Sequence, residues 1–281
     1  MLEPQDVGHV LVDMTSDLVR LSTIRYTRHM QIAESNVIVT GGGSGIGKGL
    51  CERFASLGAS NVMVADLDVD AATSVAEAIG GTARQCDVGD ERSVEALVND
   101  TIADIGHIDL FCANAGVGAG DGLNASNELW DLSWKVNVMG PVLAARHVIP
   151  HMQQRGGGAF VVTVSAAGLN TGPTSFNYAT SKHAALGVAE WLAINHGPTV
   201  SVHAICPTIV DTPMAPEFGT VLFEPLTVDD VVDATVDGID KGVFLIPVGP
   251  GVVEGFQAKA GDYDAFLSNM QQRVQSLNPS D

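Results

Sequence analysis

Short apolar runs alternate with amphipathic segments along most of this chain. The first run, Asn36-Val-Ile-Val-Thr40, is rich in β-branched residues, which is typical of a strand buried on both faces. Strands that alternate with helices form parallel sheets covered by helices on both faces, so the pattern predicts a doubly wound α/β fold of about seven strands. The predicted strands are 36–40, 61–65, 83–86, 108–113, 159–164, 200–205 and 243–247; the predicted helices are 48–57, 69–79, 91–105, 128–153 and 178–195, with one more after 250.

The first 35 residues do not follow this rhythm. Apolar residues recur at helical spacing there, which predicts an amphipathic helix over about 10–24. This extension is either an arm packed on the domain or on a neighbouring subunit, or a mobile tail. From residue 36 to 281 the alternation continues without a repeat or a linker, which predicts one domain after the extension.

Charge and cysteine usage narrow the functional class. The net charge of −19 argues against binding to nucleic acids and to anionic membrane surfaces. The four scattered cysteines form no C-x-x-C pair, so they are expected to be reduced core residues, and no metal site is expected. With no apolar run long enough to span a membrane and no signal-peptide pattern, we expect a cytoplasmic protein.

A glycine-rich turn, Gly41-Gly-Gly-Ser-Gly-Ile-Gly47, follows the first strand and precedes a helix. Gly41 permits a tight turn, Gly45 allows a pyrophosphate to approach the backbone, and Gly47 lets the helix lie close to the strand. The pyrophosphate would lie at the positive N-terminus of the helix. Strand, glycine turn and helix in this order predict a dinucleotide site.

The second strand ends at Asp66, where a carboxylate can accept hydrogen bonds from the adenosine ribose hydroxyls. It would repel a 2′-phosphate, and its neighbours Leu67 and Asp68 include no basic residue. This position therefore favours NAD over NADP.

The segment Ser175-Phe-Asn-Tyr-Ala-Thr-Ser-Lys182 carries candidate proton-transfer chemistry. Tyr178 and Lys182 are four residues apart, which on a helix places both side chains on one face. An ammonium beside a phenol favours the phenolate, so we expect a lowered pKa for Tyr178. Polar residues that end predicted strands should meet the pair at the carboxyl edge of the sheet, where ligands bind in such folds: Asp66, Asp87, Asn114, Ser165 and Thr208.

At this point the sequence resembles the classical short-chain dehydrogenases/reductases, over about 36–250. Thr40–Gly47 is similar to the T-G-x-x-x-G-x-G cofactor loop of that family, and Asn114-Ala-Gly116 to its N-A-G turn. The resemblance implies a Rossmann-type fold and a catalytic set of Asn137, Ser165, Tyr178 and Lys182. It implies a cofactor site comprising Gly41, Ser44, Gly45, Ile46, Gly47, Asp66, Leu67, Asp87, Val88, Asn114, Ala115, Gly116, Tyr178, Lys182, Pro207, Thr208, Ile209 and Thr212.

The resemblance also implies a role for each catalytic residue. Tyr178 exchanges a proton with the substrate oxygen, and Ser165 hydrogen-bonds that oxygen. Lys182 binds the nicotinamide ribose and lowers the pKa of Tyr178, while Asn137 holds a water in a proton relay. Thr208 departs from the family, which often has glycine there, and its side chain could narrow the space beside the nicotinamide or contact the carboxamide.

The substrate loop, about 212–226, is short and contains no Lys or Arg. Its apolar residues are Met214, Phe218, Phe223 and Leu226. We therefore hypothesise an uncharged, fairly apolar secondary alcohol or its ketone as the small-molecule substrate, with NAD as cofactor. The alternatives are an NADPH-preferring carbonyl reductase and a non-catalytic nucleotide-binding member of the same fold. We expect a homo-oligomer, either a tetramer or, preferably, a dimer formed through the helices that contain Asn137 and Tyr178.

Overall fold

The computed structural model describes residues 30–118, 122–172, 176–215 and 224–277. All of its strands pair in parallel in one seven-stranded sheet with the order β3-β2-β1-β4-β5-β6-β7. The chain order reverses between β1 and β4, so the sheet has a topological switch point at its centre. The strands are β1 (Asn36–Thr40), β2 (Asn61–Asp66), β3 (Thr82–Gln85), β4 (Leu110–Ala113), β5 (Gly158–Thr163), β6 (Val200–Pro207) and β7 (Leu245–Val248).

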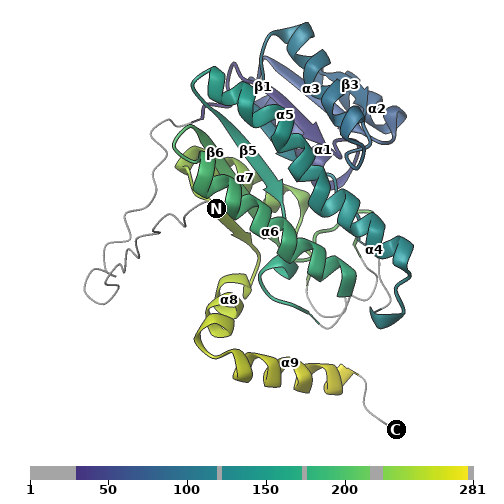
Figure 1. Ribbon diagram of the computed structural model, residues 1–281, viewed down its shortest axis with the longest axis vertical. Coiled ribbons are helices and arrows are strands. Elements are labelled where there is room, and N and C mark those ends of the chain that lie inside the picture. The colour runs from purple at the N-terminus through teal and green to yellow at the C-terminus, as the bar shows by residue number, and fades with distance from the viewer. Residues whose placement is uncertain (1–29, 119–121, 173–175, 216–223, 278–281) are drawn as a thin grey trace, which may run out of the picture.

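Helices cover both faces of this sheet (Figure 1). One layer holds α1, α2 and α7, and the other holds α3, α5 and α6, as the two separate hydrophobic clusters on either side of the sheet require. The predicted doubly wound Rossmann-type α/β fold is therefore confirmed. The α-helices are α1 (Gly45–Ser56), α2 (Val69–Ile79), α3 (Glu91–Ile105), α4 (Asn127–Trp134), α5 (Gly140–Gln154), α6 (Phe176–His196), α7 (Val228–Lys241), α8 (Val252–Gly261) and α9 (Tyr263–Leu277).

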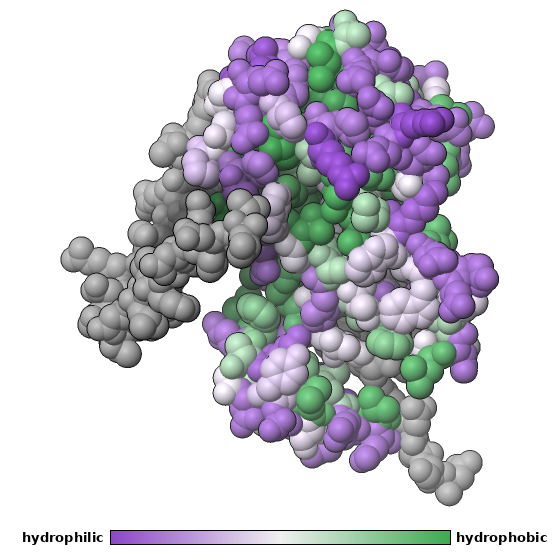
Figure 2. Space-filling view, viewed as in Figure 1, coloured by the Kyte–Doolittle hydropathy of each residue, from purple (hydrophilic) through white to green (hydrophobic). Residues whose placement is uncertain are grey.

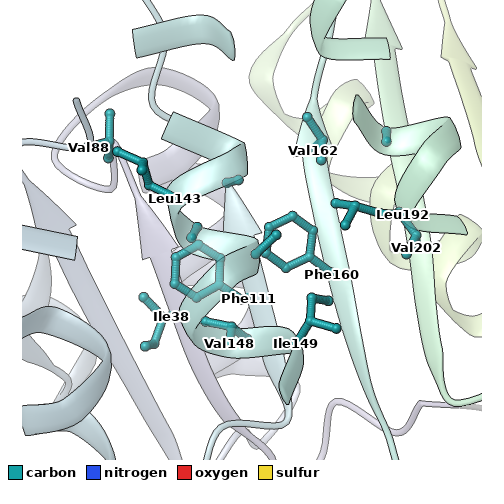
Figure 3. Packing of buried hydrophobic residues seen from close by; sticks show 14 of the residues in the cluster. Ile38, Val88, Phe111, Leu143, Val148, Ile149, Phe160, Val162, Leu192 and Val202 are labelled. Carbon is teal, nitrogen blue, oxygen red and sulfur yellow. The ribbon is translucent and has the colours of Figure 1, made fainter. Parts of the chain in front are cut away.

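The central strands are buried on both faces, and their sequences are accordingly largely apolar. Phe111 of β4 and Phe160 of β5 stack at the middle of the sheet, with ring centroids 5.5 Å apart (Figure 3). Ile149 and Val148 of α5 close over these rings from one side. This packing holds β4 and β5 in place and so positions the residues that follow the two strands.

All four cysteines are buried and free, as the scattered spacing predicted. Burial raises the pKa of Cys51 to about 12 and that of Cys86 to about 11. These thiols are therefore protonated at neutral pH and act as small apolar residues.

The predicted boundaries need several corrections. The helix after the glycine turn begins at Gly45 rather than Lys48, because the last glycines of the turn already adopt its first turn. The strand predicted at 108–113 begins at Leu110, and that predicted at 200–205 extends to Pro207. The predicted helix 128–153 is interrupted by a π-helical turn, η2 (Lys135–Met139), between α4 and α5. Helix α7 was not predicted.

The C-terminal segment forms two helices where one was expected. In Figure 1, α8 leads down from the body of the molecule, and α9 runs across below it, apart from the sheet. The predicted helix at 10–24 lies outside the described residues, as do Phe218 and Phe223 of the predicted substrate loop. Within the described ranges, none of the helices has both the length and the apolar character that a membrane span requires. Figure 2 shows a largely hydrophilic surface over the end formed by α2, α3 and β3.

Candidate functional site

The glycine turn packs closely on itself and on the residues that follow β4, so a side chain would not fit at Gly41 or Gly47. A Cβ on Gly47 would lie 2.0 Å from the carbonyl oxygen of Gly41 and 2.5 Å from Nδ2 of Asn114. Gly41 has a φ of +67° and lies against the backbone of Ala115, and Gly45 has a φ of +50°. The turn is therefore a bare backbone surface that joins β1 to the start of α1.

The N-terminus of α1 differs from those of the neighbouring helices. Side chains of Asp68, Asp90, Ser126 and Thr227 accept hydrogen bonds from the first turns of α2, α3, α4 and α7. Ser44, at the corresponding position of α1, makes no such bond, and no acidic residue lies in the first turn. With Ile46 half-buried behind it, this end presents backbone N–H groups that suit an anion.

Asp66 lies directly against the glycine turn. Its Oδ2 accepts a hydrogen bond from the backbone N–H of Gly43 at 2.9 Å, and its Oδ1 accepts from Asp68 at 3.1 Å. The next residue, Leu67, is 65% exposed. The two hydrogen bonds hold the carboxylate at the end of β2, so the negative charge is fixed beside the turn.

Asp87 and Val88 follow β3 and reach the same edge. Oδ1 of Asp87 accepts from the N–H of Gly89 at 2.9 Å, and its Oδ2 lies 3.4 Å from Nζ of Lys135 in the π-helical turn. Val88 packs on Gly140, at the start of α5. The sequence analysis did not predict this contact of Lys135, because the two residues are far apart in the chain and no motif links them.

Asn114 ties three strands together at the switch point. Its Nδ2 donates to the carbonyl of Thr40 at 3.0 Å and to that of Gly41 at 3.3 Å. Its Oδ1 accepts from the hydroxyl of Thr163, the last residue of β5, at 3.0 Å. This bridge connects the glycine turn to the strand that precedes Ser165, and it sets the position of Ala115 and Gly116.

Asn137 lies within the π-helical turn and is buried. Its Oδ1 accepts from the N–H of Val117, and its Nδ2 donates to the carbonyl of Val117, both at 2.9 Å. Nδ2 also donates to Ser181, whose hydroxyl donates in turn to the carbonyl of Tyr178. π-Helical turns of this kind occur frequently at functional sites. Ser181, which the sequence reading did not single out, thus links Asn137 to the Tyr178 helix.

Tyr178 and Lys182 share one face of α6, as their spacing predicted. Nζ of Lys182 lies 5.6 Å from the centre of the Tyr178 ring and donates to the carbonyl of Thr163 at 2.8 Å. Lys182 is 3% exposed, and burial lowers its pKa to about 8. Gly116 lies between this ammonium and Asn137, since a Cβ there would be 3.4 Å from Nζ and 3.3 Å from Oδ1 of Asn137.

The expected lowering of the pKa of Tyr178 is wrong for this structure. Burial raises the pKa of Tyr178 above its ordinary value, and hydrogen bonding with the Ser165 side chain only partly opposes this. The Lys182 ammonium, which donates to the Thr163 carbonyl, does not offset this effect of burial. Ser165 itself is buried, and its Oγ accepts from the N–H of Ala167 and lies 3.4 Å from the carbonyl of Pro207.

The segment after β6 closes the edge of the site. Thr208 donates its N–H to Val248, and its Oγ1 would be 2.3 Å from a Cβ on Gly249, so its side chain packs toward β7. Ile209 accepts from Leu226, which closes the base of the substrate loop. Thr212 lies against the glycine turn, with Cγ2 3.2 Å from the Cβ position of Gly45.

These residues fit a dinucleotide cofactor. The bare turn offers room and N–H groups for a pyrophosphate, and Asp66 stands at the end of β2 where a ribose would lie. The predicted site residues thus come together along the carboxyl edge of the sheet, from Asp66 at one side to Thr212 at the other. Thr163, which sequence reading missed, connects the cofactor turn to Lys182.

Comparison with known proteins agrees with this geometry. The family model of short chain dehydrogenases matches residues 35–220, more than half of the chain. The chain belongs to the short-chain dehydrogenase family.

Individual relatives support the assignment to this family. The 2,5-dichloro-2,5-cyclohexadiene-1,4-diol dehydrogenase of Sphingobium indicum is 39% identical over 189 residues, covering 65% of this chain and 75% of the relative. Dehydrogenase/reductase SDR family member 4 of Homo sapiens is 32% identical over 201 residues, covering 69% and 72%. A crystal structure of a short-chain dehydrogenase/reductase from Burkholderia phymatum in complex with NAD superposes with a TM-score of 0.76 at 27% identity, over 84% of this chain and 96% of that one. This short-chain dehydrogenase is therefore placed among oxidoreductases.

Proposed function

We propose that this short-chain dehydrogenase interconverts a secondary alcohol and its ketone with NAD(H), using Tyr178 as the general acid/base. One observation carries the proposal: Ser165, Tyr178 and Lys182 lie together beside the glycine turn. Ser165 hydrogen-bonds with Tyr178, and Thr163 accepts from Lys182 and donates to Asn114, which holds the turn. We also propose that residues 36–281 form one domain, preceded by the 1–35 extension.

The proposed cofactor site is the surface formed by the glycine turn, Asp66 and the residues that follow β3, β4 and β6. When bound, the nicotinamide cofactor supplies or accepts the hydride. Asp66 favours NAD because its carboxylate would accept from ribose hydroxyls and repel a 2′-phosphate. Leu67 and Asp68 beside it offer no cation to offset that repulsion.

Tyr178 is proposed to transfer the proton. Since burial raises its pKa, the phenol stays protonated at neutral pH and can donate to a ketone oxygen. Ser165 lies beside it and can hydrogen-bond the same oxygen, which stabilises the negative charge that develops there. Lys182, whose pKa burial lowers to about 8, is still mainly charged near neutral pH. Its proposed role is to bind the nicotinamide ribose beside Tyr178.

The proposed substrate is uncharged, fairly apolar and cyclic. A Cβ on Gly118 would lie 3.3 Å from Cγ of Met214 and 3.8 Å from Cε2 of Tyr178, so an apolar side chain borders the proposed proton donor. The Sphingobium indicum relative is a dehydrogenase of a cyclic diol. The loop 212–226 contains no Lys or Arg that would hold an anionic group.

The first test is titration of the purified protein with NADH and with NADPH, followed by a panel of cyclic secondary alcohols and ketones. We expect tight binding of NADH, weak binding of NADPH and turnover of uncharged ring alcohols. Turnover confined to anionic acyl thioesters would refute the substrate class. Binding of NADH with no turnover across the panel would favour a non-catalytic nucleotide-binding protein.

Two variants test the roles of single residues. Tyr178→Phe should bind NADH normally and lose about 10²-fold or more in kcat, as expected when a general acid/base is removed. Near-normal kcat in this variant would rule out Tyr178 as the proton donor.

Asp66→Ala should reduce the preference for NADH over NADPH. Glu77→Ala removes an exposed carboxylate from α2 and serves as its control. Equal preference in both variants and the parent would exclude Asp66 from cofactor selection.

We further propose a homodimer that buries the exposed face of α6. Phe176, Trp191 and Ile194 are 47%, 59% and 79% exposed, and their spacing places them on one helix face. Gly187 lies on the same face with nothing within 4 Å of its Cβ position, so a second helix can approach closely. Sedimentation of Ile194→Glu should show monomers where the parent shows dimers. The four buried, free cysteines support the proposal of a cytoplasmic location.

A further inference from the structure

Lys259 of α8 is a buried lysine in an otherwise mostly exposed helix. It is 9% exposed, and its Nζ donates to the carbonyl of Leu169 at 2.8 Å and lies 3.2 Å from Nε2 of His183. The rings of Tyr263 and Phe266 lie 5.5 and 6.0 Å from the same nitrogen. Burial of an ammonium is unfavourable unless its N–H groups are satisfied, so these contacts define one position for the lysine.

The hydrogen bonds of His183 fix its orientation. Its Nδ1 lies 2.9 Å from the carbonyl of Ala179 on the same helix, and this carbonyl can only accept. Nδ1 therefore carries the proton, and Nε2 is the acceptor for the lysine, which has donors only. Lys259 and His183 thus form a directed hydrogen bond between α8 and α6, from Nζ to Nε2.

The two partners of Lys259 belong to the two halves of the proposed proton-transfer site. Leu169 ends the tight turn that begins at Ser165, in which Gly168 and Asn170 donate their N–H groups to Ser165 and Ala166. His183 is the residue after Lys182 on the helix that carries Tyr178.

The turn after β5 and α6 are in close contact where Lys259 joins them. A Cβ on Gly168 would lie 2.7 Å from the carbonyl oxygen of Lys182. Asn170 adds a second attachment to α8, since its Nδ2 donates to the carbonyl of Val252 at 3.1 Å. Helix α8 thus contacts the Ser165 turn at two points and α6 at one.

We propose that Lys259 is a positioning residue that holds the Ser165 turn against α6 and so sets the distance between the Ser165 hydroxyl and the Tyr178 phenol. The inference rests on the proposed function, because it assigns Lys259 to the same reaction. It acts through backbone and imidazole contacts on either side of the site, and touches no reacting atom. Misplacement of reacting groups by about 1 Å can reduce rates by about 10²-fold, so even a small displacement of the turn should be measurable.

The test is a double-mutant cycle between Lys259→Met and Ser165→Ala, measured as kcat with a substrate that the parent turns over. Lys259→Met keeps most of the apolar stem and removes the ammonium. We expect a loss of about 10-fold or more in the parent background and less than about 2-fold in the Ser165→Ala background, because the lysine would act through Ser165. Affinity for NADH should stay within about 2-fold of the parent, since α8 is attached to β7, α9, the Ser165 turn and α6 rather than to the glycine turn.

Equal losses in the two backgrounds would overturn the proposal, because a general loss of packing acts whether or not Ser165 is present. Unchanged kcat in Lys259→Met would overturn it as well. Lys241→Met is the matched control, since that lysine is exposed at the end of α7 and pairs with Asp237. If Lys259→Met does not fold, Lys259→Gln keeps a donor for Leu169 and goes through the same cycle, with a smaller loss expected in the parent background only.

A second readout does not depend on turnover. Hydrogen exchange of the peptide that covers 165–171 should be faster in Lys259→Met than in the parent, and unchanged in Lys241→Met. If the parent turns over none of the panel, the proposed function fails, while this exchange measurement still tests the attachment by Lys259. Unchanged exchange in Lys259→Met would show that the lysine does not hold the turn, whatever the protein catalyses.

Discussion

Gly47→Ala should weaken the binding of NADH more than any other single methyl addition in the glycine turn. The new Cβ would lie 2.0 Å from the carbonyl oxygen of Gly41, and ordinary contact begins at 3.4 Å, so the overlap is about 1.4 Å. The nearby atoms are backbone atoms of Gly41 and the Asn114 amide, which is itself held by Thr40. Neither can move aside as the end of a flexible side chain would.

The expected magnitude follows from the cost of such overpacking. Forcing an extra methyl group into a close-packed site costs about 1–3 kcal/mol. If the turn relieves the overlap by opening, that cost appears as lost cofactor affinity of about 5- to 150-fold, since about 1.4 kcal/mol corresponds to a factor of ten. The same distortion would break the Asn114 hydrogen bonds, so part of the cost should also lower stability.

The assay is NADH titration followed by nicotinamide fluorescence, together with thermal unfolding of the free protein. Gly261→Ala is the control, because a Cβ at that position meets nothing within 4 Å and its φ is not positive. The control should bind NADH as the parent does. If Gly47→Ala also binds NADH as tightly as the parent and unfolds at the same temperature, the close approach of α1 to the turn has no bearing on the cofactor site.

Two further predictions concern the support of the sheet. Thr227→Ala removes the two hydrogen bonds of the Thr227 hydroxyl, which accepts from the Asp230 N–H and donates to the Asp230 carboxylate at the start of α7. It should lower the free energy of unfolding by about 1 kcal/mol in urea, whereas Thr227→Ser should not. For His203, burial lowers the pKa from 6.5 to about 4, so the neutral ring is favoured in the folded state. Because the unfolded chain takes up this proton at a higher pH than the folded protein does, the free energy of unfolding is unaffected by His203 above pH 6.5. It falls by about 3 kcal/mol as the pH drops from 6.5 to about 4. His203→Gln should flatten that part of the stability profile; an unchanged acid slope would refute this.

The sequence predicts the sheet and the cofactor turn well because both depend on local patterns. A buried parallel strand must be apolar at every position, and a turn with no space for a Cβ must be glycine, so 36–47 carries its own structure. Helix α7 was missed although Thr227 and Asp230 form a capping box that marks its start. The sequence analysis assigned no element to 228–241, although this signal stands directly after the predicted substrate loop.

Other features depend on contacts that no local pattern encodes. One extra residue per turn is enough to make the π-helical turn at Asn137, and hydrophobic spacing does not resolve so small a change. Spacing placed Lys182 beside Tyr178, but it gave neither the burial that raises the pKa of Tyr178 nor the Thr163 carbonyl that receives the ammonium. Lys259 could not be singled out at all, because its partners come from segments about 80 residues earlier in the chain.

The position of β1 between β2 and β4 has a consequence for how the protein folds. β1 pairs with β2, which follows it closely, but also with β4, about 70 residues later. The pairing of β1 with β4 joins the half of the sheet formed by β1 to β3 to the half formed by β4 to β7. A long loop must close, at a cost in chain entropy, before the β1–β4 hydrogen bonds can form, so we expect this step to be slow. The Asn114 bridge to Thr40 forms across this seam. During refolding, the ability to bind NADH should consequently appear late, after most helical structure has formed, and its time course would report the union of the two halves.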